Sequence, residues 1–277
     1  MDTFEQNNYI RLLTLIGGSN YSNNLINISL SNFYDEWNES TPDTPALKKV
    51  DYTMIPYCID KDLYENYMDF DLWKGIFADS SNNISRVQRS KLIKEDPEAF
   101  RTLVNYLTKH NHEIFSGEKT IIFVPTATQA RTLQTELVKS YASSGEQTPS
   151  IYVYDSRPDS KKHHEYIFNH FNRSGSNIVI SVFMLSEGFD VPTITTAVLF
   201  GSHKSDKDWI QKIGRALRQP REETNWSTAK IYDLVTFTPS PTCDITFTSD
   251  LDNVIDFQQD RVKTLHRLHQ KFSEGNT

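Results

Sequence analysis

Residues 208–218 combine one amide and two guanidinium side chains in a pattern that suits phosphate binding. The stretch contains Gln211, Gly214, Arg215 and Arg218 in the arrangement Q-x-x-G-R-x-x-R. On a helix, Gln211, Arg215 and Arg218 are spaced i, i+4 and i+7, so all three point to one side. Two arginines held together in this way can bind the charged oxygens of a phosphate chain. The alternative interpretation is a solvated basic helix face.

A second group of polar residues follows an apolar run at 177–182. The run ends at Ser181 and Val182, and the loop after it carries Ser186, Glu187, Gly188 and Asp190. Ligands of open parallel sheets bind beyond the carboxyl ends of the strands. Glycine permits a close backbone approach, and the hydroxyl and carboxylate groups can bind phosphate or ribose. An ordinary turn with Asp190 as a helix cap is the alternative.

Composition and charge limit the class of protein. The chain has 277 residues, a hydrophobic content of 37% and a formal net charge of −7, which predict a folded chain of one or two domains and argue against a general nucleic-acid coat protein. Residues 203–221 carry a net positive charge, opposite in sign to that of the whole chain, with six Lys or Arg against two Asp. Two distant cysteines, Cys58 and Cys243, make a disulfide framework unexpected.

The start of the chain predicts no secretory signal, and no run approaches the length of a membrane helix. We therefore expect a cytoplasmic or intracellular location, which includes an infected host cell, and no membrane partner. No metal site is expected either, because adjacent residues such as His163 and His164 diverge by about 100° on a helix.

Hydrophobic periodicity predicts an alternation of strands and helices from about residue 93. An earlier strand is predicted at 50–59 and a short helix at 61–68. Further strands are predicted at 120–124, 151–154, 177–182, 195–200 and 230–235. Helices are predicted at 97–110, from Thr126 or Thr128 to 141, at 159–172, 207–217 and 250–272. The alternation indicates an α/β fold with a parallel sheet sandwiched by helices.

Three segments together resemble the second RecA-like lobe of superfamily 2 helicases. They are Phe123-Val-Pro-Thr126, the stretch S-x-x-M-L-x-E-G-F-D-V-P that begins at Ser181, and Q-x-x-G-R-x-x-R. They look most similar to the branch that contains type III restriction subunits and phage DNA helicases. The resemblance implies a mixed N-terminal extension or inter-lobe linker over 1–85, the helicase lobe over 86–236 and a C-terminal helical tail over 237–277.

The resemblance also implies a role for each matching residue. Arg215, Arg218 and Gln211 match the motif VI residues that meet the ATP phosphates, and one arginine acts as the arginine finger. Motif V residues that link nucleotide to nucleic acid match Glu187, Gly188 and Asp190. Contacts to the nucleic-acid backbone would come from Thr126, Thr128 and Ser181. These last contacts are independent of base sequence, because phosphate oxygens carry no base identity.

The parts of a complete motor that bind ATP and Mg²⁺ are expected on another lobe. A phosphate-binding loop G-x-x-x-x-G-K-[ST] is absent from the sequence. We therefore expect a second motor lobe that binds nucleic acid, DNA rather than RNA, and hydrolyses ATP only when joined to a first lobe. Two alternatives are a non-catalytic regulatory or decoy protein that docks on another motor, and a scaffold without a motor role.

Overall fold

The central element is a six-stranded, all-parallel β-sheet. The computed structural model describes residues 47–65, 91, 94–116, 118–155, 164–171, 175, 177–182, 194–200, 206–218, 227–239 and 251–274. The strand order across the sheet is β1-β6-β5-β2-β4-β3. The strands are β1 (Lys49–Cys58), β2 (Lys119–Val124), β3 (Ser150–Tyr154), β4 (Asn177–Val182), β5 (Thr196–Leu199) and β6 (Thr228–Phe237). The central strands β2, β4 and β5 are almost wholly buried, as continuous apolar runs in a parallel sheet require.

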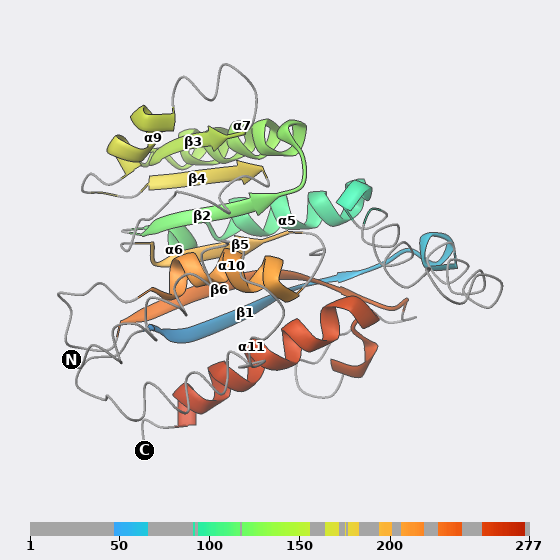
Figure 1. The fold of residues 1–277 in the computed structure, drawn as a ribbon. Coiled ribbons are helices and arrows are strands. Elements are labelled where there is room, and N and C mark those ends of the chain that lie inside the picture. The colour runs from blue at the N-terminus through green and yellow to red at the C-terminus, as the bar shows by residue number, and fades with distance from the viewer. Residues whose placement is uncertain are drawn as a thin grey trace, which may run out of the picture.

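Helices cover both faces of this sheet, as Figure 1 shows. One face packs against α5 (Pro97–Lys109), α6 (Asn111–Phe115) and α7 (Ala127–Ser144), through Leu103, Leu107, Leu133 and Leu137 among others. The other face packs against α9 (His164–Phe171), α10 (Asp206–Leu217) and α11 (Asp256–Glu274), through residues that include Phe171, Ile213 and Leu265. The predicted α/β class, with a parallel sheet between helices, is confirmed.

β1 joins the sheet although it lies in the N-terminal part of the chain, far from its partner in sequence. It pairs in parallel with β6 over ten residues, from Lys49 opposite Thr228 to Cys58 opposite Phe237. The domain division near residue 85 stays a prediction, but β1 shares the core of the strands that follow. Cys58 is disulfide-bonded. The prediction that a disulfide framework is unlikely missed this bond, because it rested on separation in sequence, and the pairing of β1 with β6 shows that distant segments of this chain lie side by side.

The C-terminal helix covers the β1 edge of the sheet. The expected helix over 250–272 is divided into a short 3₁₀ turn, η3 (Leu251–Asn253), and α11. The division arises because Val254 forms a bridge with Phe237 and Thr238 donates a backbone hydrogen bond to Asn253. His269 of α11 accepts a hydrogen bond from the backbone N–H of Tyr52 at 3.1 Å. Such coverage protects an edge strand from pairing with other chains.

A buried ion pair holds α11 to the sheet. Arg261 of α11 donates two hydrogen bonds to Asp233 of β6, at 2.8 and 2.9 Å, and both side chains are buried. Tyr52 of β1 donates a third to the same carboxylate, at 3.2 Å. Burial, together with the neighbouring carboxylate, holds the pKa of Tyr52 well above its ordinary value, so the hydroxyl stays protonated as a donor. The pKa of Asp233 is raised by burial, and the guanidinium opposes that rise.

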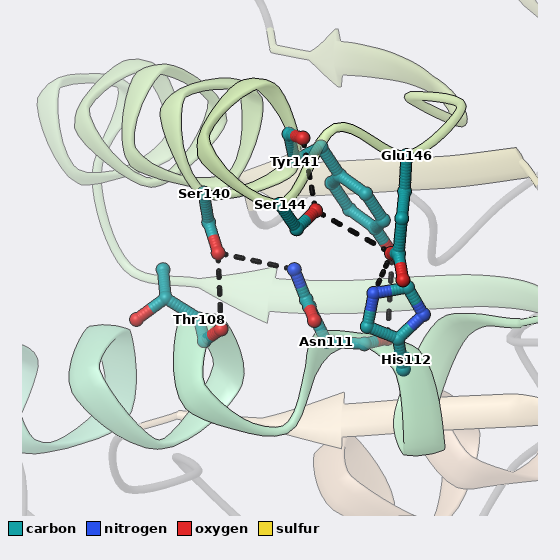
Figure 2. Close-up of polar contacts among 7 residues, drawn as sticks. All are labelled: Thr108, Asn111, His112, Ser140, Tyr141, Ser144 and Glu146. Atoms are coloured by element: carbon teal, nitrogen blue, oxygen red, sulfur yellow. Dashed lines mark hydrogen bonds and ion pairs between the residues drawn. The ribbon is translucent and has the colours of Figure 1, made fainter.

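A polar cluster joins α5, α6 and α7 on the opposite face (Figure 2). Asn111 donates to the hydroxyl of Ser140 at 3.0 Å, and that hydroxyl donates to the carbonyl of Thr108 at 3.0 Å. Tyr141 donates to the carbonyl of Asn111 at 3.3 Å, and His112 forms an ion pair with Glu146. These contacts lie at the ends of the helices and satisfy groups that the helices leave open.

Within the described ranges, no helix is long and apolar enough to cross a membrane. The same residues contain no group of three or more His, Cys, Asp or Glu side chains placed to hold a metal ion.

Candidate functional site

α10 carries Arg215 of the Q-x-x-G-R-x-x-R pattern, and Arg218 directly follows the end of the helix. The helix spans Asp206–Leu217, and its apolar stripe of Trp209, Ile213, Ala216 and Leu217 is buried against the sheet. The backbone of Gln211 lies in this helix, while its side chain is outside the described part of the structure. The helix predicted over 207–217 is therefore confirmed to within one residue.

The two arginines differ in exposure. Arg215 is 4% exposed, whereas Arg218, one turn later, is half-buried. A solvated basic face would leave both side chains in water, so that alternative fails for Arg215. A buried guanidinium needs nearby polar groups, since an isolated buried charge is strongly unfavourable. Of the two arginines, Arg218 is the one whose side chain is partly exposed to solvent and can contact a ligand.

The carboxyl-terminal end of α10 lies at the amino edge of the sheet, the edge at which all strands begin. The carbonyl of Leu217 accepts a hydrogen bond at 2.8 Å from the backbone N–H of Lys48, the residue before β1. Arg218 forms an isolated antiparallel bridge with Leu47. Because α10 follows the carboxyl end of β5 and runs back across the sheet, its arginines lie toward the opposite edge from its start.

Thr126 and Thr128 lie at the carboxyl edge, where β2 ends and α7 begins. Thr126 is the N-cap of α7: its hydroxyl accepts from the backbone N–H of Gln129 at 3.2 Å, and the Gln129 side chain accepts from the Thr126 N–H at 3.2 Å. This reciprocal capping box decides between the two residues expected as the cap. Both threonines are exposed, with Thr128 in the first turn.

Ser181 lies near the carboxyl end of β4 and is fully buried. It is in register with Phe123 of β2 and Tyr154 of β3, and its hydroxyl has no hydrogen-bond partner among the residues the structure describes. Because the hydroxyl is fully buried, a nucleic-acid backbone can contact it only after a local rearrangement.

The remaining candidates of the second motif lie elsewhere. Glu187, Gly188 and Asp190 fall in the segment 183–193, outside the described residues. The described structure resumes at Ile194, just before β5. Phosphate-binding candidates on α10 and backbone-contacting candidates on α7 are thus at opposite edges of the sheet.

Two lysines near these residues were not singled out from the sequence. The ammonium of Lys212, on α10, lies 5.8 Å from the ring centroid of Phe123, so it covers the carboxyl half of β2. Lys48 is buried at 2% exposure and donates to the carbonyl of Ile194 at 2.5 Å. No local signal could have found Lys48, because its partners are 146 and 169 residues away in the chain.

The family comparison places a known domain over the elements from α5 to α10. Residues 98–219 match the model of the helicase conserved C-terminal domain. One curated relative is the pre-mRNA-processing ATP-dependent RNA helicase PRP5 of Candida glabrata, which is 23% identical over 162 residues, 58% of this chain. The matched part covers only 19% of that helicase, so this chain corresponds to a small part of it.

Two solved structures resemble this chain. The first is Mss116p DEAD-box helicase domain 2 bound to an RNA duplex, with 16% identity, a TM-score of 0.38, and coverage of 62% of this chain and 72% of that one. The second is T4 UvsW, with 13% identity, a TM-score of 0.47, and coverage of 82% and 40%.

Proposed function

We propose that this chain is the second motor lobe of an ATP-dependent helicase or translocase of superfamily 2, because residues 98–219 match the helicase conserved C-terminal domain and the parallel sheet has the RecA-like fold. The observation that carries the proposal is that the matched segment includes the whole of α10, with Gln211 and Arg215, and Arg218 directly after it. In this role the chain needs a first lobe, with a phosphate-binding loop, for ATP hydrolysis.

The donor set on α10 fits a phosphate chain and not a metal. Guanidinium groups bind phosphate oxygens through paired N–H donors. In this proposal Mg²⁺ and most of the ATP would be held by the first lobe, which would carry the phosphate-binding loop. When bound, ATP would supply the γ-phosphoryl group whose transfer drives the motor. Arg218 would stabilise the charge on that group, a role worth roughly 10³–10⁵ in rate in related chemistry.

The exposed start of α7 supports a nucleic-acid contact at the carboxyl edge. A helix of 18 residues begins there, and the first-turn N–H groups and the helix dipole favour a phosphate at this end. Thr126, Thr128 and, after a movement, Ser181 are the proposed backbone contacts, with Glu187, Gly188 and Asp190 as the proposed link to the nucleotide. The expectation of DNA over RNA has no support, because PRP5 is described as an RNA helicase.

Binding and hydrolysis by the purified chain test this proposal. Fluorescence anisotropy would measure binding of labelled RNA duplex, DNA duplex and the matching single strands between 50 and 200 mM salt. Backbone binding should weaken steeply with salt, because Lys and Arg contacts release counterions from the phosphates. ATP hydrolysis would be measured with each nucleic acid, before and after addition of a lobe that carries the phosphate-binding loop.

The results separate a motor lobe from the alternatives. Salt-sensitive nucleic-acid binding without hydrolysis, followed by hydrolysis once the first lobe is added, is the expected outcome. Hydrolysis by the chain alone, lost in Arg215→Ala, would show that the chain holds its own phosphate site. Nucleic-acid binding with no hydrolysis in any reconstituted pair would favour a regulatory protein.

A further inference from the structure

Lys48 is a fully enclosed cation at the amino edge of the sheet. It is 2% exposed and ranks among the largest buried side chains of the described residues. Its ammonium donates to the carbonyl of Ile194 at 2.5 Å, and its backbone N–H donates to the carbonyl of Leu217 at 2.8 Å. Lys48 therefore contacts both Ile194, just before β5, and Leu217, at the end of α10.

The chemistry of this contact is specific to a lysine. Burying an ammonium is strongly unfavourable unless polar groups surround it, and an apolar residue of similar volume would fill the same space without that penalty. The backbone contact to Leu217 would survive such a replacement, whereas the contact to Ile194 would not. The ammonium is therefore needed for the connection to Ile194 and not for filling the space.

Lys48 joins two points that are far apart in sequence. Ile194 lies just before β5, and Leu217 directly precedes Arg218. Leu47, directly before Lys48, forms the bridge with Arg218 itself. If Leu47 and Lys48 moved relative to the end of α10, the backbone of Arg218 would move with them.

We propose that Lys48 is a positioning residue that couples Ile194, just before β5, to Arg218. The lysine holds the carboxyl-terminal end of α10 against the start of β5, and so sets where the Arg218 guanidinium stands. This inference rests on the proposed function only in taking phosphate as the ligand of Arg218; the mechanical connection stands without it.

Nuclear magnetic resonance of the side-chain N–H groups in the full chain tests the proposal. The Arg218 Nε–Hε signal would be assigned by its loss in Arg218→Lys and titrated with inorganic triphosphate. In Lys48→Met the signal should move toward that of exposed Arg101, and triphosphate should bind at least fivefold more weakly. Lys48→Arg, which keeps a cation, should restore most of both. The matched control is Lys61→Met, since the Lys61 side chain is 79% exposed and should change neither.

The unmodified chain gives a second measurement that does not depend on folding of a variant. The Lys48 ammonium signal should be protected from exchange with water, unlike that of Lys61. An Lys48 signal that exchanges as fast as Lys61, or an unmoved Arg218 signal in folded Lys48→Met, would overturn the proposal. An Arg218 signal that moves in Lys48→Met but ignores triphosphate in the unmodified chain would support the coupling and reject phosphate as the ligand.

Discussion

Arg215 and Arg218 differ in their exposure to solvent. Arg215, on α10, is 4% exposed, whereas Arg218, directly after the helix, is half-buried. The buried arginine is suited to fixing the helix and its neighbours, and the half-buried one to reaching a ligand. The sequence motif does not distinguish the two arginines, but their burial does.

Arg218→Ala should remove most ATP turnover from the assembled motor while sparing nucleic-acid binding. The expected loss is on the order of 10³ in kcat, because a stabilising charge on the γ-phosphoryl group is removed. Steady-state hydrolysis and anisotropy with the same nucleic acid would measure the two properties. Arg101→Ala, on the exposed surface of α5, is the matched control. Unchanged turnover in Arg218→Ala would refute the finger assignment.

Asn111→Ala should destabilise the helical layer formed by α5, α6 and α7. Asn111 is 4% exposed and donates to Ser140, whose hydroxyl would lose a buried partner. Losing one such bond lowers the free energy of unfolding by about 1–2 kcal/mol. The urea midpoint would measure the change, with exposed Asn105→Ala as the control. Equal midpoints for the two variants would contradict the structural role of this cluster.

At the scale of elements, the start of α7 combines structure with a proposed contact. The Thr126 hydroxyl both accepts from Gln129 and donates to its side-chain oxygen, at 3.2 and 3.0 Å. Gln129 in turn donates to the carbonyl of Lys94 at 2.9 Å, which joins the cap to the segment ahead of α5. The cap thus contributes to stability whether or not nucleic acid binds there.

Thr126→Ala should lower the free energy of unfolding by about 1 kcal/mol, because the capping box is lost. Thr128→Ala is the matched control: it is exposed in the same turn, is not the N-cap and should change stability by less than about 0.5 kcal/mol. Chemical denaturation would measure both. Weaker RNA or DNA binding in both variants would indicate a direct contact, whereas an effect of Thr126→Ala alone would reflect the cap.

The connection between α11 and the sheet depends on one carboxylate. Arg261→Met should destabilise the protein by about 3–5 kcal/mol, because it leaves Asp233 buried without its ion pair. The double variant with Asp233→Leu should recover a large part of this loss, since no buried charge remains. The urea midpoints of the single and double variants would measure this recovery of stability. A double variant no more stable than Arg261→Met would contradict this account.

At the scale of the whole molecule, several tyrosines make stability sensitive to alkaline pH. Burial raises the pKa of Tyr141 to about 12, and burial also raises those of Tyr57 and Tyr232 above their ordinary value. In the unfolded chain these hydroxyls lose their protons near pH 10. Between about pH 10 and 12 the unfolded state therefore holds fewer protons, and stability falls as pH rises.

The melting temperature should accordingly be steady from pH 7 to 9 and fall between pH 10 and 12. Tyr141→Phe should make that fall shallower, because one of the titrating groups is removed, although it also loses the bond to the Asn111 carbonyl. Thermal melts at half-unit intervals of pH would measure the slopes. A slope unchanged in Tyr141→Phe would show that Tyr141 does not contribute.

The α/β class and most elements followed from local patterns. Helix periodicity and short apolar runs depend on residues within one window of sequence, and the strands at 120–124 and 177–182 and the helix at 207–217 were predicted almost to the residue. The spacing of Gln211, Arg215 and Arg218 predicts that the three side chains share one side of a helix, and this remains a prediction because α10 ends at Leu217 and the Gln211 side chain lies outside the described residues.

Strand order and the edges of the sheet required the folded molecule. Nothing near residue 50 indicates that β1 pairs with β6, or that Lys48 meets residues 146 and 169 positions away. These pairings are set by the burial of two apolar faces at once, a property of the whole chain. The same long-range packing placed Arg218 at the amino edge and Thr126 at the carboxyl edge, a separation that motif spacing alone does not contain.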